Sequence, residues 1–304
     1  MTRRSFKILL IFILSLTTYY ANAQGCSDAG FCTINSIKPN SSDTVTESTN
    51  QVKVGVSLGS ADNSISIFGN YIEYNRQVTN SFGIDAIITS LSQSGNGISN
   101  FGISDIYLTG NYKVNEKLKL ILGTKIPLTD GNKKKDNIAL PMDYQSSLGT
   151  FDLIFGAGYE IKKIQLVLAY QQPMSQNKNE FIAENYPVNS KIREFQTTNK
   201  FKRSSDVLLR VSYPVKLGEK FRITSSLLPI YHLSNDKYTN NLGIENEIKG
   251  SQGLTLNGNA YLDYEINNKN ALQLNVGMPF VVRDARPDGL TRSFVVNLEY
   301  KVKF

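Results

Sequence analysis

The sequence contains a single histidine, His232, which is followed two positions later by Ser234 and fourteen positions later by Asn246. Residues at positions i and i+2 of a strand lie on one face, so the imidazole could take the proton of the hydroxyl. A third side chain would then hold the ring in one tautomer. The alternation of the preceding residues turns His232 away from the apolar face, unless a bulge near Pro229 resets the register. This pattern favours a histidine at the edge of a loop with polar neighbours.

The first 23 residues have the composition of a secretory signal peptide. Arg3, Arg4 and Lys7 give a basic start, residues 8–16 form an uninterrupted apolar run, and Ala21-Asn22-Ala23 offers the small residues of a cleavage site. The apolar run is shorter than the roughly 20 residues of a membrane-spanning helix. We therefore expect residues 1–23 to direct export and to be removed.

The only two cysteines, Cys26 and Cys32, lie in residues 24–50, a stretch rich in Ser, Thr and Asn without alternation. In an oxidising compartment such a pair is expected to form a disulfide in an irregular periplasmic segment. Acylation of Cys26 is the alternative, although a large apolar residue three places before it is missing. No metal site is expected, because the lone histidine lies more than two hundred residues away.

From residue 51 onward, segments of about ten residues alternate apolar and polar side chains, as membrane-spanning strands do. The last segment is the clearest, because every second residue from Phe294 to Phe304 is apolar. The pattern predicts an all-β fold over residues 51–304, a transmembrane antiparallel up-and-down β-barrel of about 12 strands. We expect these at 51–59, 65–75, 82–91, 102–113, 117–128, 150–160, 163–172, 204–213, 220–232, 253–264, 271–281 and 293–304.

The connections between these strands support the count. After the second strand, short connections alternate with mostly longer ones, which are expected at 92–101, 129–149, 173–203, 233–252 and 282–292. An even number of strands with this alternation places both termini in the periplasm and the long loops outside the cell.

The predicted inward face of the strands carries charges of both signs. Paired charges would stiffen the interior, whereas a polar path for solutes is the functional alternative. Eight strands leave an interior filled by side chains and sixteen leave an open channel, so twelve strands do not decide between the two. The predicted lumen-lining residues are Asp85, Asp105, Asp152, Asp206, Arg210, Arg222, Asp263, Glu299 and Lys301, together with Lys119 and Lys125.

The last long loop combines Arg283, Arg286 and Arg292 with Asp284 and Asp288. Its Pro-Asp-Gly sequence is typical of a turn, so the charges could cap the rim of the barrel. An inward-folded constriction lined by the three arginines is the alternative.

Three stretches resemble known families. The ending at Phe304 resembles the last strand of Gram-negative outer-membrane proteins, which implies that Phe304 is an assembly signal read by the barrel-assembly machinery. Residues 102–108, 112–114 and 122–129 are similar to a transporter family named for a phenol-degradation gene cluster, which implies a barrel that passes small, often hydrophobic, molecules. The His232-x-Ser234 run with Asn246 is similar to the active site of outer-membrane phospholipase A and of lipid A deacylases. That similarity implies Ser234 as nucleophile, His232 as base and Asn246 as the orienting residue.

Taken together, the sequence predicts an outer-membrane channel or transporter that passes small molecules through a polar lumen. A lipid hydrolase and a non-conducting barrel that anchors a periplasmic partner through residues 24–50 are the alternatives. Expected partners are outer-membrane lipids, lipopolysaccharide, the barrel-assembly machinery and an unidentified small solute, without a cofactor. Without residues 1–23 the chain has 30 basic and 26 acidic residues and no basic patch, which argues against nucleic-acid binding.

Overall fold

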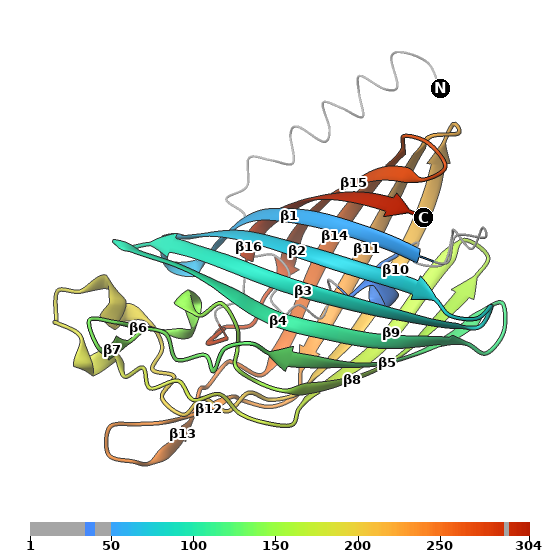
Figure 1. The fold of residues 1–304 in the computed structure, drawn as a ribbon. Helices are drawn as coiled ribbons and strands as arrows, with labels where there is room; N and C mark the ends of the chain where they lie inside the picture. The colour runs from blue at the N-terminus through green and yellow to red at the C-terminus, as the bar shows by residue number, and fades with distance from the viewer. Residues whose placement is uncertain (1–33, 40–49, 289–291) are drawn as a thin grey trace, which may run out of the picture.

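The structure, a computed structural model, describes residues 34–39, 50–288 and 292–304. Its twelve long strands form a closed antiparallel barrel in which β16 returns to pair with β1 (Figure 1). The predicted fold class and strand count are confirmed. The barrel strands are β1 (Asn50–Ala61), β2 (Ile65–Gln77), β3 (Phe82–Gly95), β4 (Ile98–Lys113), β5 (Leu118–Pro127), β8 (Asp152–Ile161), β9 (Ile164–Pro173), β10 (Asp206–Leu217), β11 (Phe221–His232), β14 (Gly253–Glu265), β15 (Asn270–Val281) and β16 (Arg292–Lys303).

The remaining described elements are short and are not part of the barrel wall. They are the strand pairs β6 (Lys134–Lys135) with β7 (Ile138–Ala139) and β12 (Lys237–Thr239) with β13 (Glu245–Glu247), and the 3-10 turns η3 (Asn35–Ile37), η4 (Asp62–Ser64), η5 (Met142–Tyr144), η6 (Ala183–Asn185) and η7 (Lys191–Glu194). No helix among the described residues has the length and hydropathy to cross a membrane.

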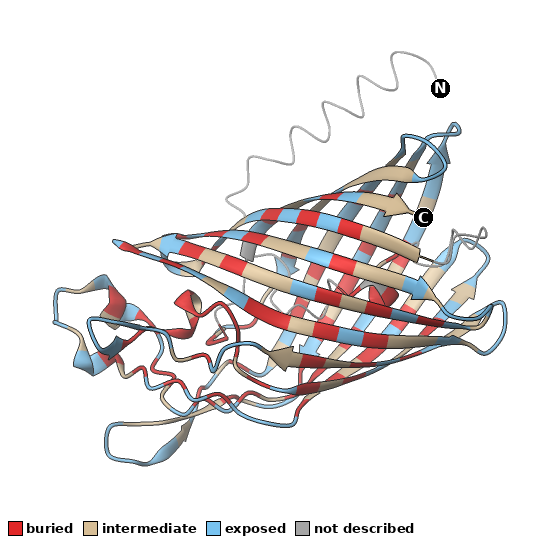
Figure 2. Ribbon diagram, viewed as in Figure 1, coloured by how far each residue is buried: buried red, intermediate tan, exposed pale blue. Residues whose placement is uncertain are grey.

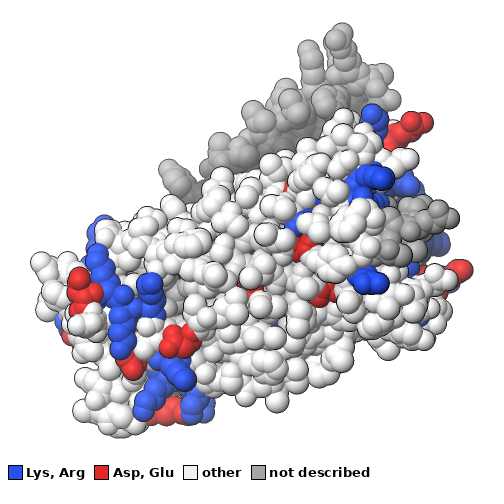
Figure 3. All heavy atoms as spheres, viewed as in Figure 1, with Lys and Arg blue, Asp and Glu red and all other residues white. Residues whose placement is uncertain are grey.

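Side chains alternate between the two faces of the barrel wall, as the period of a strand requires. On β5, for example, Leu120 and Leu122 are exposed on the outside, whereas Ile121 and Lys125 are buried inside. Figure 2 shows this alternation as bands of buried and exposed residues along the strands. On the face in Figure 3, charged side chains gather toward the two ends, and the wall between them is largely uncharged. Such an apolar exterior suits a lipid environment.

One predicted connection is wrong. Residues 92–101 were expected to form a loop, but β3 and β4 continue as a hairpin through most of this stretch. Asn96 and Gly97 form its two-residue turn with φ values of 50° and 75°. A tight hairpin turn of this kind requires positive φ at both central residues, which Asn-Gly tolerates best. The wall of the barrel is therefore taller here than the sequence suggested.

The two ends of the barrel differ. The start of β1 and the end of β16 meet at one end, where Phe304 N donates a hydrogen bond to Asn50 O at 3.1 Å. We call this the N-terminal end; its strand connections span only 78–81, 114–117, 162–163, 218–220 and 266–269. At the opposite end, the connections 128–151, 174–205, 233–252 and 282–291 are long. Four of the five long connections expected from the sequence are observed at this end, which also has the short connections 62–64 and 96–97.

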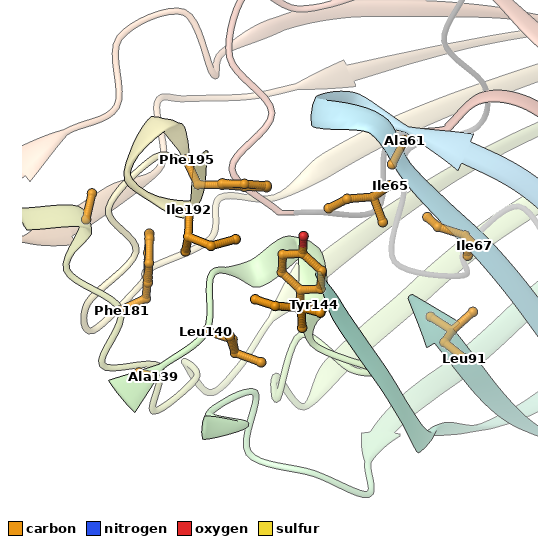
Figure 4. Packing of buried hydrophobic residues seen from close by; sticks show 12 residues of the cluster. Ala61, Ile65, Ile67, Leu91, Ala139, Leu140, Tyr144, Phe181, Ile192 and Phe195 are labelled. Carbon is orange, nitrogen blue, oxygen red and sulfur yellow. The ribbon is translucent and has the colours of Figure 1, made fainter. Parts of the chain in front are cut away.

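The long connections fold back over the barrel and form what we call the lid, residues 128–151, 174–205, 233–252 and 282–288. Tyr144, Phe181 and Phe195 of the lid pack with Ile65 and Leu91 from the ends of β2 and β3 in one buried apolar cluster (Figure 4). Part of the lid enters the lumen, because two inward side chains donate hydrogen bonds to its backbone. Gln93 Nε2 reaches Gln145 O at 2.6 Å, and Asn100 Nδ2 reaches Tyr144 O at 2.7 Å.

Candidate functional site

The lumen is the candidate functional site, and the predicted lumen residues all occupy inward-facing strand positions. Six are buried: Asp85, Asp105, Asp152, Asp206, Arg210 and Glu299. Arg222, Asp263, Lys301 and Lys119 are half-buried, and Lys125 is buried. The alternation of the strands was sufficient to place these residues, because a strand has only two faces.

Residues 34–39 form a segment inside the barrel, which we call the plug (Figure 1). Its side chains Ile34 and Ile37 are 0% exposed. They pack in one apolar cluster with inward-facing residues of seven strands, namely Ile87, Tyr107, Ile121, Ile154, Val167, Ala169, Leu208, Leu228 and Ile230. The plug therefore occupies the middle of the lumen, on the side formed by β3 to β11.

Polar contacts also fasten the plug to the wall. Ser36 Oγ donates a hydrogen bond to Asp85 Oδ2 at 2.6 Å, and Lys38 Nζ forms an ion pair with Glu299 Oε2 at 3.0 Å. Glu299 also accepts a hydrogen bond from Tyr71 and lies 3.9 Å from Lys53 Nζ. Two of the predicted lumen carboxylates thus bind the plug.

A second ion pair spans the lumen wall between β5 and β8. Lys125 Nζ lies 2.7 Å from Asp152 Oδ2 and donates to Thr150 Oγ1 at 2.9 Å, and both charged side chains are 0% exposed. Gln171 donates a further hydrogen bond to Asp152. A buried pair of this kind stiffens the wall, because neither charge can be left alone without a large desolvation cost.

Lys125→Met is expected to lower the free energy of unfolding by about 3 kcal/mol, because Asp152 then stays buried without its cation. Lys134→Met is the matched control, since Lys134 pairs with Glu180 at the surface and exposed pairs contribute little. Urea unfolding in lipid vesicles measures both. Equal effects of the two substitutions would contradict a structural role for the buried pair.

His232 lies at the long-loop end of the lumen and contacts two carboxylates. Its Nδ1 is 2.6 Å from Oδ1 of Asp206, the first residue of β10, and its Nε2 is 2.8 Å from Oδ1 of Asp236 in the lid. A neutral imidazole has one N–H donor, so only the protonated ring donates to both carboxylates. The geometry therefore favours a cationic His232 that joins the wall to the lid.

Further ion pairs extend this contact into a cluster. Arg203 pairs with Asp206 and lies 3.9 Å from Asp288, while Arg283 Nη2 pairs with Asp288 at 3.1 Å. Arg283 Nη1 also donates to the backbone oxygen of Ser251 at 2.9 Å. We call the cluster the clamp. It holds three cations and three carboxylates, all buried: His232, Arg203, Arg283, Asp206, Asp236 and Asp288.

The structure does not assemble the hydrolase site. Both ring nitrogens of His232 contact carboxylates, so neither is available to take the proton of Ser234. The Ser234 Oγ lies 2.8 Å from Ser204 Oγ, and the Asn246 amide donates to Ile244 O at 3.0 Å. His232 also faces inward, as its alternation predicted, whereas a lipid hydrolase needs a site that lipid can reach.

The remaining predicted residues have separate positions. Arg286 pairs with Asp62 through Nη2 at 2.6 Å, so Arg283 and Arg286 both engage carboxylates of the rim and lid. The side chain of Arg292, the first residue of β16, lies outside the described residues, as do residues 1–33 with Cys26 and Cys32. Sequence reasoning did not find Ile34, Ile37 and Asp236. The first two carried a faint signal, two apolar residues at i and i+3 in a polar stretch.

Asp143 gives the lid a dependence on pH. Burial raises the pKa of Asp143 to about 7, and the charges of Asp62 and Asp288 act in the same direction. In the folded lid the Asp143 carboxyl keeps its proton up to about pH 7, whereas in the unfolded chain it loses the proton near its ordinary pKa of 3.8. The free energy of unfolding of the lid therefore falls as the pH rises between these two values. Limited proteolysis should therefore cut the lid faster at about pH 8 than at about pH 5. Asp143→Asn should reduce this difference, and an unchanged difference would exclude Asp143 as its source.

The similarities of this chain to known proteins are similarities of structure and not of sequence. No family model and no curated protein match the sequence. Among solved structures, the translocator domain of the autotransporter NalP from Neisseria meningitidis matches with a TM-score of 0.46 at 8% identity, covering 99% of this chain and 96% of that one.

Two outer-membrane channels are similar to the same degree. The KdgM porin matches with a TM-score of 0.44 at 8% identity, covering 84% of this chain and 99% of its own. The CymD monoaromatic hydrocarbon channel matches with a TM-score of 0.43 at 9% identity, covering 92% of this chain and 94% of its own. At these TM-scores the similarities say nothing about the activity of this chain. Because no family model matches, the resemblances to the phenol-degradation-cluster family and to phospholipase A stay predictions.

Proposed function

We propose that this protein is an outer-membrane channel or transporter for small molecules, in a closed state. The observation that carries the proposal is a lumen that contains many charged and polar residues besides the apolar cluster around the plug, inside a wall with an apolar exterior. A barrel that served only as an anchor would have little use for a chain segment packed in the middle of its lumen. The plug and the lid close the same path at two levels, one after the other.

The orientation follows from the loops. Bacterial barrels have short periplasmic turns and long external loops. We therefore propose that the N-terminal end faces the periplasm and the lid faces the outside of the cell. Phe304, exposed at the periplasmic rim, is then in position to be recognised during assembly by the barrel-assembly machinery. The exterior would contact lipids and, on the outer side, lipopolysaccharide.

Solute flux into liposomes tests the proposal. Refolded mature protein and a variant without residues 24–39 are each reconstituted, and swelling is followed in solutes of increasing size. We expect slow swelling with the mature protein and faster swelling, with a size limit, for the truncated variant. If neither form passes any solute while both fold as barrels, the channel proposal fails and the anchoring alternative takes its place.

A further inference from the structure

The clamp fastens the lid to the barrel wall, and the single histidine of the chain lies at its centre. His232 is the last residue of β11 and is buried. Its Nδ1 faces Asp206 of the wall, its Nε2 faces Asp236 of the lid, and both carboxylates are 0% exposed. One imidazole ring therefore joins the wall to the lid segment 233–252.

Asp236 connects several parts of the lid with one another. Its Oδ1 accepts a hydrogen bond from Ser204 N at 2.8 Å, and its backbone N donates to Ser251 Oγ at 2.8 Å. Its backbone O accepts a hydrogen bond from Ile248 N at 2.8 Å. Ser251 O in turn accepts a hydrogen bond from Arg283 Nη1 at 2.9 Å. Displacement of the Asp236 carboxylate would therefore loosen three segments of the lid at once.

The two carboxylates at His232 differ in their other partners. Asp206 also forms an ion pair with Arg203. Asp236 forms no second ion pair within the described part of the chain, and its Oδ2 is buried there without a hydrogen-bond partner. A buried carboxylate without a cation is strongly destabilising. The charge of Asp236 is thus compensated by the imidazolium of His232.

The two contacts of the ring require both of its N–H groups. An imidazolium has two N–H donors, whereas a neutral imidazole has one and presents a lone pair at the other nitrogen. After loss of a proton, one carboxylate must therefore face that lone pair, whichever tautomer forms. In both tautomers the ring is uncharged, so that Asp206 keeps Arg203 as its cation while Asp236 loses the imidazolium.

The other charged side chains of the clamp do not alter this requirement. Arg203 pairs with Asp206, and Arg283 pairs with Asp288 at 3.1 Å. β14 adds no charge beside the ring, because the residue opposite it is Gly253. These charges influence the pH at which the ring loses its proton, but not the number of N–H groups on a neutral ring. The same is true of the charged side chains outside the described residues, among them Asp28 and Arg292.

We propose that the clamp is a pH-sensitive latch, which holds the lid closed while His232 is protonated and releases it when the ring loses a proton. Histidine is the side chain whose charge ordinarily changes nearest to physiological pH. The stabilisation of the lid by the clamp is complete while the ring holds both protons, and it is lost as the pH rises through the titration of the ring. An effect on transport rests on the proposed function, whereas the release of the lid does not.

NMR spectroscopy combined with limited proteolysis tests the latch. Because the chain has one histidine, a ¹⁵N-labelled imidazole reports the titration of His232 alone. The refolded mature protein carries Asp143→Asn, so that Asp143 does not contribute to the pH dependence of the lid. Cleavage of segment 233–252 is compared with that of the unfolded chain at the same pH. Between about pH 6 and about pH 10 we expect cleavage to become about tenfold faster, with the same midpoint as the ring titration.

Two variants complete the experiment. His232→Gln has an uncharged side chain at every pH, so its lid should be cut rapidly throughout, whereas the matched control Ser234→Ala should keep the step. A step that persists in His232→Gln would overturn the proposal. So would a ring that titrates while the rate of cleavage stays constant, or a ring that keeps one protonation state over the whole range. These last two results are obtained with His232 in place, so they count even if His232→Gln does not fold.

The outcome is separable from that of the flux experiment. A step in lid cleavage without solute flux in any form of the protein supports the latch and contradicts the channel proposal. Flux through the truncated variant without a step in lid cleavage supports the channel proposal and contradicts the latch.

Discussion

Ile34→Asp/Ile37→Asp should release the plug and raise the open probability of the barrel in planar bilayers by about a hundredfold or more. Each isoleucine buries its whole side chain in the lumen cluster, a contribution of about 2 kcal/mol, and each aspartate would instead bury an unpaired charge. Single-channel recording of the refolded mature protein measures this. Current steps should be rare in the wild type and frequent in the variant.

The control for this prediction is Leu242→Asp, which adds a charge at a lid position that is 77% exposed. It should leave the open probability unchanged. If the plug variant forms a folded barrel and yet stays as silent as the wild type, residues 34–39 do not limit the path. The closure would then have to be assigned to the lid alone.

The strands were predictable because their signal is local. A residue of a barrel strand faces either lipid or lumen, so alternation alone assigned Asp85, Arg210 and Glu299 to the interior. The extension of β3 and β4 across 92–101 was missed because Gly and Ser residues hid the alternation. The Asn96-Gly97 pair was the available signal, since this dipeptide favours a two-residue hairpin turn.

The interactions inside the barrel were not predictable, because they join residues far apart in the sequence. Alternation predicts that Lys125 and Asp152 face the lumen, but not the strand register that pairs them. It makes no prediction for Asp236, which lies in a loop. For the same reason, the role predicted for His232 differs from the contacts that the structure shows. Its neighbour in sequence, Ser234, suggested a nucleophile, whereas its neighbours in space are two carboxylates.

His232→Ala should open the lid, the second large effect that we expect. Without the imidazole, Asp206 and Asp236 both lose a charged partner in a buried site, and removing one member of such an ion pair costs about 3–5 kcal/mol. Arg203 still compensates Asp206, so the loss falls mainly on Asp236 and on the lid segment 233–252. Proteolysis of this segment in proteoliposomes should become faster, and open times in single-channel recordings should lengthen.

Ser234→Ala is the matched control, because Ser234 is exposed and contacts Ser204 rather than His232. If His232 acts in the clamp, only its substitution should change the rate of proteolysis and the open time of the channel. In a lipid hydrolase, both substitutions should abolish phospholipid cleavage, and neither needs to alter the lid. Under the proposed function the plug and the clamp close one path in series, so their open probabilities should multiply. Combining His232→Ala with Ile34→Asp/Ile37→Asp should therefore give more current than either change alone, and equal currents would mean that one of the two does not obstruct the path.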